Sequence, residues 1–223
     1  MTDLTTYLNS TQLAYDTAAG AYAEIIPPLF PQDLYAHAVF GVFAERVRRA
    51  DAGPVADLGC GPGHVTAHLN SLGLSAFGVD LSPKTVAEAR RAHPGLRFEE
   101  GTMTGLDLAD GSLGGVVAWY STVHTPPELL PTVFAEFHRV LAPGGYLLLG
   151  FKVGDLLRHL DHAYGHDLSL DVYWLDPEHV VGLVEQAGLP MESQLIREPD
   201  DYERATQGRQ AILIARKPDD ATA

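Results

Sequence analysis

Three glycines and two acidic residues lie at the ends of the first two strand-like segments, at a spacing that suits a nucleoside ligand. Asp57, Gly59, Gly61 and Gly63 form a D-x-G-x-G-x-G loop, and Asp80 ends the next strand-like segment. Glycine lets a backbone turn sharply and approach a ligand closely. A carboxylate at the tip of the neighbouring strand can accept hydrogen bonds from both hydroxyls of a ribose. The pattern therefore predicts a nucleoside-binding loop.

This loop differs from the two common phosphate-binding loops. A dinucleotide fingerprint reads G-x-G-x-x-G, but here the third glycine comes early and His64 stands in its place; a P-loop would end in Gly-Lys-Ser/Thr. Asp57 would repel a phosphate, whereas it can face an ammonium group. The combination favours a nucleoside that carries an amino acid, and S-adenosylmethionine is such a ligand. Two alternatives stay open: a plain strand-to-helix turn, and Asp80 as a simple cap for the helix near Ser82.

The segments that must position these residues alternate between short apolar strands and helices. Strands are expected at 54–58, 75–80, 96–100, 114–120 and 146–151, after a turn at 143–145, and helices at 64–73, 82–93, 127–142 and 176–189. Such alternation is typical of βαβ units in a mainly parallel sheet. Segments 191–198 and 209–217 are expected to pair as a closing antiparallel hairpin. The fold class is therefore α/β, doubly wound.

The sequence resembles the class I S-adenosylmethionine-dependent methyltransferases of the small-molecule type. VADLGCGPG, GVDLS, HRVLAPGGYLLLGF and AILIARK stand in that family's order and spacing, and the resemblance covers residues 53–217. It implies a mainly parallel, seven-stranded Rossmann-like sheet, with S-adenosylmethionine as cofactor and S-adenosylhomocysteine as product. The cofactor-binding residues that it implies in the two acidic motifs are Asp57, Gly59, Gly61, Gly63, Asp80 and Leu81.

Further cofactor contacts are expected after the third and fourth strands and in the N-terminal helix. Many relatives carry an acid near the adenine where this chain has Thr102 and Met103, which are expected to border the ring instead. The resemblance also places contacts at Trp119 and Tyr120. In relatives a tyrosine of the N-terminal helix covers the methionine end of the cofactor, and Tyr15 is the candidate. The alternative is that Tyr15 belongs to a core stripe.

The acceptor site is expected beyond the carboxyl ends of the fourth and fifth strands. His124 is the first candidate for a general base, because histidine titrates near working pH; alternatively it caps a helix or bonds a loop carbonyl. His166, at a chain turn in the polar stretch 152–172, is the second. The histidines of that stretch do not have a convincing ligand spacing, so no metal is expected.

The chain is expected to form one domain. Residues 1–50 read as a helical cap, residues 51–217 as the cofactor-binding domain with a lid-like insertion near 152–172, and residues 218–223 as a tail. The segment 25–35 is apolar and broken by prolines, and is expected to form a wall of the acceptor pocket.

The composition restricts the possible partners. The net charge of −14 disfavours nucleic acid, which leaves a small-molecule acceptor. No apolar run reaches the roughly 18 residues of a membrane span, and no signal peptide is evident. The single cysteine, Cys60, is typical of a cytoplasmic protein. We expect a monomer or homodimer that methylates an oxygen or nitrogen. The alternatives are a cofactor-binding protein that catalyses a non-methylating reaction, and a sensor.

Overall fold

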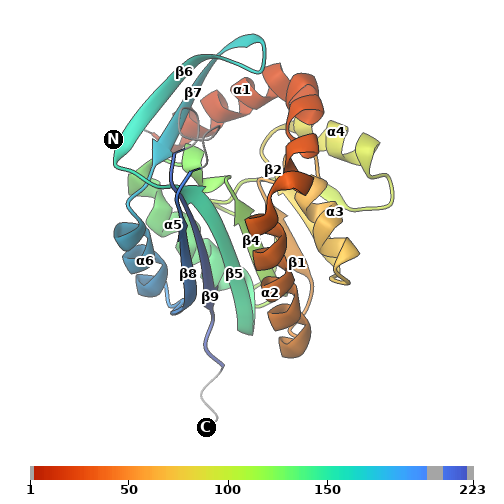
Figure 1. Ribbon diagram of the computed structural model, residues 1–223, viewed down its shortest axis with the longest axis vertical. Helices are drawn as coiled ribbons and strands as arrows, with labels where there is room; N and C mark the ends of the chain where they lie inside the picture. Colours follow the sequence, from red (N-terminus) through yellow and green to blue (C-terminus); the bar gives the residue numbers. More distant parts are fainter. Residues whose placement is uncertain (1–2, 200–207, 220–223) are drawn as a thin grey trace.

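The computed structural model describes residues 3–199 and 208–219, and its centre is a seven-stranded sheet between two layers of helices (Figure 1). Five strands run parallel: β1 (Val55–Leu58), β2 (Ala76–Asp80), β3 (Phe98–Glu100), β4 (Leu113–Trp119) and β5 (Leu141–Lys152). β9 (Gln210–Arg216) runs antiparallel to β5 on one side and to β8 (Met191–Arg197) on the other, so β9 is the reversed strand of this sheet. The predicted fold class, including the closing hairpin, is confirmed.

The order of the strands sets where a ligand can bind. The order is β3-β2-β1-β4-β5-β9-β8, so the chain moves outward from β1 to β3 and then returns to the other side of β1 with β4. Loops that leave β1 and β4 therefore diverge above the carboxyl edge. A crevice at this switch point is the usual ligand site of open α/β sheets.

Each face of the sheet is covered by helices, which agrees with the nearly continuous burial of β1, β4 and β5. On one face lie α2 (Leu34–Ala50), α3 (His64–Ser71) and α4 (Pro83–Ala92), and on the other lie α5 (Leu130–Val140) and α6 (Pro177–Gln186). The predicted helix starts at α4 and α6 are confirmed, since the caps Ser82 and Asp176 accept hydrogen bonds from the backbone N–H groups of Thr85 and His179.

Helix α1 (Leu4–Ile25) and a separate hairpin lie over the carboxyl edge of the sheet (Figure 1). The hairpin consists of β6 (Leu156–Ala163) and β7 (His166–Trp174), which pair antiparallel around a turn at Tyr164 and Gly165. It occupies the predicted insertion. Strand β7 packs against α1, and a short 3-10 helix, η1 (Pro27–Gln32), joins α1 to α2.

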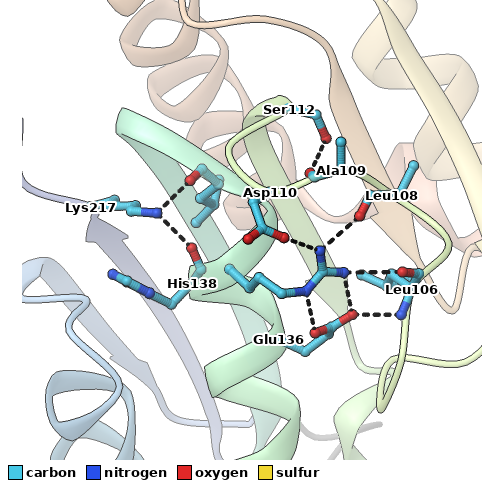
Figure 2. A network of polar contacts seen from close by, with 10 residues as sticks. Leu106, Leu108, Ala109, Asp110, Ser112, Glu136, His138 and Lys217 are labelled. Atoms are coloured by element: carbon cyan, nitrogen blue, oxygen red, sulfur yellow. Dashed lines mark hydrogen bonds and ion pairs between the residues drawn. The ribbon is translucent and has the colours of Figure 1, made fainter.

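Arg139 of α5 fastens the loop between β3 and β4. Its guanidinium donates to the carbonyl oxygens of Leu106 and Leu108, to the carboxylate of Asp110 at 2.6 Å, and to both oxygens of Glu136. Figure 2 shows this network, in which Glu136 also accepts from the backbone N–H of Leu106. The network holds the end of the loop whose beginning carries Thr102 and Met103.

One predicted segment differs from the structure, and another lies partly outside the described residues. The predicted turn at 143–145 lies inside β5, because this strand already begins at Leu141 and Gly144 takes a φ of 77° within it. The predicted tail at 218–223 lies outside the described residues from position 220 onward. In the described part of the chain, no helix is long and apolar enough to span a membrane.

Candidate active site

A cavity opens at the carboxyl ends of β1, β2 and β4, beneath α1. The space between its walls, including the open mouth, measures about 690 Å³. It is lined by Tyr7, Thr11, Tyr15, Tyr22, Leu58, Gly59, Gly61, Val79, Asp80, Leu81, Ser82, Gly101, Thr102, Met103, Trp119, Tyr120, Ser121 and His124. Most of the residues predicted to bind a cofactor therefore meet in one place.

The glycine loop forms the floor of this cavity. Gly59, Gly61 and Gly63 have φ values of 70°, 55° and 84°, a region that strongly favours glycine. A Cβ at Gly59 would overlap the side chain of Ser121, and a Cβ at Gly61 would lie 3.1 Å from the Tyr22 ring. Gly63 does not line the cavity, because it packs against the Phe98 ring beneath the loop.

Asp80 holds the loop and lines the cavity at the same time. Its Oδ2 accepts from the backbone N–H of Gly61 at 2.8 Å, and its Oδ1 accepts from the N–H of Ser82 at 2.9 Å. Burial raises the pKa of this carboxyl group, and the two backbone donors oppose that rise. The true cap of α4 is Ser82, so Asp80 is not merely a helix cap. Its remaining lone pairs are available to a ligand.

Asp57 lies below the loop rather than in the cavity wall. Its side chain is buried and its Oδ2 accepts from the Thr66 hydroxyl at 2.6 Å. Burial raises the pKa of Asp57 to about 7. The structure therefore does not bring Asp57 into contact with the cavity, although it anchors α3 to the strand that carries the loop.

The loops after β3 and β4 form the opposite wall. Thr102 shares a hydrogen bond of 2.9 Å with the Thr104 hydroxyl, and the Met103 sulfur lies 3.8 Å from the Ser121 hydroxyl. Tyr120 has a φ of 53°, which is strained for a bulky residue, and its hydroxyl donates to the Gln210 side chain. This strain is held where β4 meets the cavity, as is common at functional sites.

His124 and Tyr15, which both line the cavity, are joined by a hydrogen bond. His124 Nδ1 lies 2.8 Å from the backbone oxygen of Asp171, which can only accept, so Nδ1 carries the proton. Nε2 of the neutral ring is then an acceptor, and the Tyr15 hydroxyl, 2.7 Å away, donates to it. Burial lowers the pKa of His124 to about 4, so the imidazole is neutral at pH 7.

Besides Tyr15, which was a candidate, helix α1 contributes Tyr7, Thr11 and Tyr22 to the cavity wall, and the sequence reasoning did not assign these three. Tyr7, Thr11 and Tyr15 are spaced by four residues, so their hydroxyls follow one face of the helix. Tyr22 continues this face, and its ring meets Tyr15 edge-on with centroids 5.3 Å apart. The four-residue spacing of hydroxyl side chains was the available signal.

Other candidates lie away from the cavity. His166 is exposed at the start of β7 and does not line it. The segment 25–35 does not line it either; Phe30 instead packs among the rings of His37, His64 and His68. Within the described ranges no three His, Cys, Asp or Glu side chains are grouped so as to hold a metal ion.

Comparisons with known proteins agree with this geometry. Residues 55–145 match the family described as a methyltransferase domain. The malonyl-[acyl-carrier protein] O-methyltransferase of Pectobacterium atrosepticum is 29% identical over 110 residues, 49% of this chain and 43% of that protein. The demethylmenaquinone methyltransferase of Chlorobaculum parvum is 36% identical over 92 residues, 41% of this chain and 37% of that protein.

Among solved structures, the fold resembles that of the magnesium protoporphyrin IX methyltransferase of Synechocystis with bound S-adenosylmethionine. The TM-score is 0.67 at 16% identity, and the match covers 97% of this chain and 98% of that one. The chain spans less than half the length of the two curated relatives. The family match covers the glycine loop, Asp80 and the loops after β3 and β4. Residues 55–145 thus match a methyltransferase domain, and the fold is that of solved S-adenosylmethionine-dependent methyltransferases.

Proposed function

We propose that the protein transfers the methyl group of S-adenosylmethionine to an oxygen or nitrogen of a small molecule. The observation that carries this proposal is the meeting of the bare glycine loop, Asp80 and the loop after β4 around one cavity. The family match covers the same residues. The activity of the relatives is consistent with it, since both curated proteins are named as methyltransferases.

The cavity fits the cofactor on three grounds. Gly59 and Gly61 leave bare backbone in the floor, where a Cβ would overlap or crowd Ser121 or Tyr22. Asp80, at the tip of β2, is placed to accept from ribose hydroxyls. Thr102 and Met103 follow β3, next along the sheet edge, where they would border the adenine.

The work of the protein in such a transfer is positioning and the exclusion of water. S-adenosylmethionine, when bound, supplies a methyl group on a positively charged sulfur. Helix α1 covers the cavity with Tyr7, Tyr15 and Tyr22, which limits the access of water. His124 is neutral at pH 7 and its Nε2 accepts a hydrogen bond, so we assign to it the role of proton acceptor. His166 lies outside this arrangement and receives no role.

The charge and the cysteine content support the proposed class of acceptor and the proposed cellular location. The net charge of −14 supports a small-molecule acceptor over nucleic acid, and a single buried cysteine supports a cytoplasmic location. A monomer or homodimer is expected. Residues 51–217 are proposed as the cofactor-binding domain, with residues 1–50 contributing its cap.

The first test is calorimetric titration of the full chain with S-adenosylmethionine and S-adenosylhomocysteine. Micromolar binding is expected, and Asp80→Asn should weaken it about tenfold or more, because the loss of a charged acceptor removes at least 1.4 kcal/mol. The matched control is Asp107→Asn, an exposed acid outside the cavity, which should bind like the wild type. No binding of either compound by folded wild-type protein would refute the proposal.

The second test separates methyl transfer from the alternative functions. S-adenosylhomocysteine formed in proportion to a methylated product identifies a methyltransferase. A cofactor consumed without a methylated product indicates a non-methylating reaction. Tight binding without turnover, across a broad panel of acceptors, indicates a sensor.

A further inference from the structure

Three distant parts of the chain meet in one chain of hydrogen bonds at the cavity. Tyr15 belongs to α1, His124 to the short 3-10 helix η2 (Thr122–His124), and Asp171 to β7. The Tyr15 hydroxyl donates to His124 Nε2 at 2.7 Å, and His124 Nδ1–H donates to the Asp171 carbonyl at 2.8 Å. Both bonds have good geometry, so the direction of every proton along the chain is fixed.

Because the Tyr15 hydroxyl donates its proton to His124, the Tyr15 oxygen can act only as an acceptor toward the cavity. A phenol has one proton and two lone pairs, and its proton is committed to His124. Tyr15 and His124 both line the cavity, so the lone pairs of the phenol can receive a hydrogen bond from a bound molecule. That molecule must carry a hydrogen on the atom that faces Tyr15.

The charges around the cavity point to the same kind of molecule. Among its described lining residues there is no lysine or arginine, and the only carboxylate is Asp80. The charged groups that act on His124 from outside are Lys152 at the end of β5, which disfavours its protonation, and Asp171, which favours it. A bound carboxylate or phosphate would find no cation in the wall to offset its desolvation.

We propose that the methyl acceptor is a small molecule with an uncharged hydroxyl group, and that Tyr15 and His124 form a relay that removes the hydroxyl proton. The hydroxyl oxygen forms the new bond to the methyl carbon, and the carbon–sulfur bond breaks with its electron pair going to sulfur. The hydroxyl proton passes to Tyr15 Oη as the proton of Tyr15 passes to His124 Nε2. Tyr15 is then a catalytic residue, and His124 is a positioning residue that acts through it. This inference rests on the proposed function.

A carboxylate acceptor has no proton to lose, so it gives no reason for the relay. The low basicity of His124 is suited to a hydroxyl, because the attacking oxygen becomes strongly acidic only while the new bond forms. The base therefore stays neutral beforehand and accepts the proton late. The Asp171 carbonyl faces the resulting imidazolium and stabilises it.

The experiment is a calorimetric titration of the full chain saturated with S-adenosylhomocysteine, using 4-methylphenol and 4-methylbenzoate. These probes share one ring and differ in the group under test. Binding of the phenol at least about tenfold tighter than the benzoate is expected. Tyr15→Phe should weaken phenol binding about fivefold or more, the equivalent of one neutral hydrogen bond. The matched control is Tyr146→Phe within β5, outside the cavity wall, which should leave phenol binding unchanged.

Equal or tighter binding of the benzoate overturns the inference, and so does a failure of the phenol to bind to the saturated protein. Failure of S-adenosylhomocysteine to bind in the first step would instead count against the proposed function, so the two failures are distinguishable.

A spectroscopic measurement separates the relay from a purely structural contact. In the same saturated complex with ¹⁵N-labelled histidine, His124 should show a protonated Nδ1 and a bare Nε2. Tyr15→Phe should move the Nε2 resonance and leave the proton on Nδ1. A proton on Nε2 in the wild type, or an Nε2 resonance that Tyr15→Phe does not move, overturns the relay.

Discussion

Replacing Gly59 by alanine tests whether the bare backbone of the loop serves the ligand. Gly59 and Gly73 both have positive φ values, 70° and 85°, so alanine at either position is strained. At Gly73, just after α3, a Cβ would meet nothing within 4 Å. At Gly59 it would overlap the Cβ of Ser121, in the cavity wall after β4. The pair thus isolates the effect of close approach from that of backbone strain.

The two variants should differ in stability and in cofactor affinity. Gly73→Ala should lower the free energy of unfolding by about 1 kcal/mol, the left-handed strain partly offset by a stiffer unfolded chain. Gly59→Ala adds overpacking of about 1–3 kcal/mol, so a total of about 2–4 kcal/mol is expected. Since Ser121 must move, S-adenosylhomocysteine should bind about tenfold more weakly or worse.

Urea unfolding and calorimetric titration measure both quantities on the same preparations. Gly73→Ala should bind S-adenosylhomocysteine like the wild type, because Gly73 lies outside the cavity. The reasoning is refuted if Gly59→Ala is no less stable than Gly73→Ala and keeps wild-type affinity.

Substitutions at three further positions test the role of charge and polar contacts in stability. Burial lowers the pKa of His64 to about 4, so the unfolded chain takes up a proton between pH 7 and pH 5 and the folded state does not. Stability of the wild type relative to His64→Phe, measured by urea unfolding, should therefore fall by about 2 kcal/mol from pH 7 to pH 5. His64→Gln should remove the same pH dependence, and a free energy of unfolding that varies equally with pH in wild type and variants would contradict the prediction. The pKa of Asp57 is raised to about 7, so the folded state holds the proton at pH 5 and releases it by pH 8. Stability relative to Asp57→Asn should therefore fall by about 2–3 kcal/mol from pH 5 to pH 8 in urea unfolding. A constant difference would show that Asp57 is ionised throughout. A lysine at position 139 cannot make the forked contacts of Arg139 to Leu106, Leu108 and Glu136, so Arg139→Lys should lower the free energy of unfolding by about 1–2 kcal/mol. An unchanged melting temperature in thermal unfolding would contradict the role given to this network.

The part of the cavity that is proposed to bind the cofactor could be predicted from the sequence because its signals are local. Gly59, Gly61 and Asp80 lie within consecutive strand–loop–helix units, and the strand order that brings them together follows from the βαβ rules. The exception is Asp57, which was expected to face the ligand. Its carboxylate is instead buried against Thr66 of α3, a contact nine residues along the chain that strand periodicity does not reveal.

The secondary structure of the segment 152–172 could not be fixed for a different reason. Its polar residues pair across β6 and β7, as His159 with Asp171 and His162 with Asp167. A two-stranded hairpin held by such polar pairs shows neither the apolar alternation of a strand in a larger sheet nor the periodicity of a helix. The turn at Gly165 was the part that could be recognised, and it is where the hairpin reverses.

The part of the cavity that is proposed to take the acceptor depends on tertiary contacts that no spacing encodes. Tyr15, His124 and Asp171 are separated by 109 and 47 residues, and each lies on an element whose position is set by packing rather than by the βαβ units. Asp171 contributes its backbone oxygen, so its side-chain type carries no signal at all. The loop after β4 could suggest His124 as a base, but the proton on its Nδ1, and hence the acceptor character of Nε2, is fixed only when β7 folds against η2. The β6–β7 hairpin thereby determines which nitrogen of His124 can accept a proton. We therefore expect the substrate class of this protein to depend on how α1 and the hairpin pack over the sheet, and not on the glycine loop.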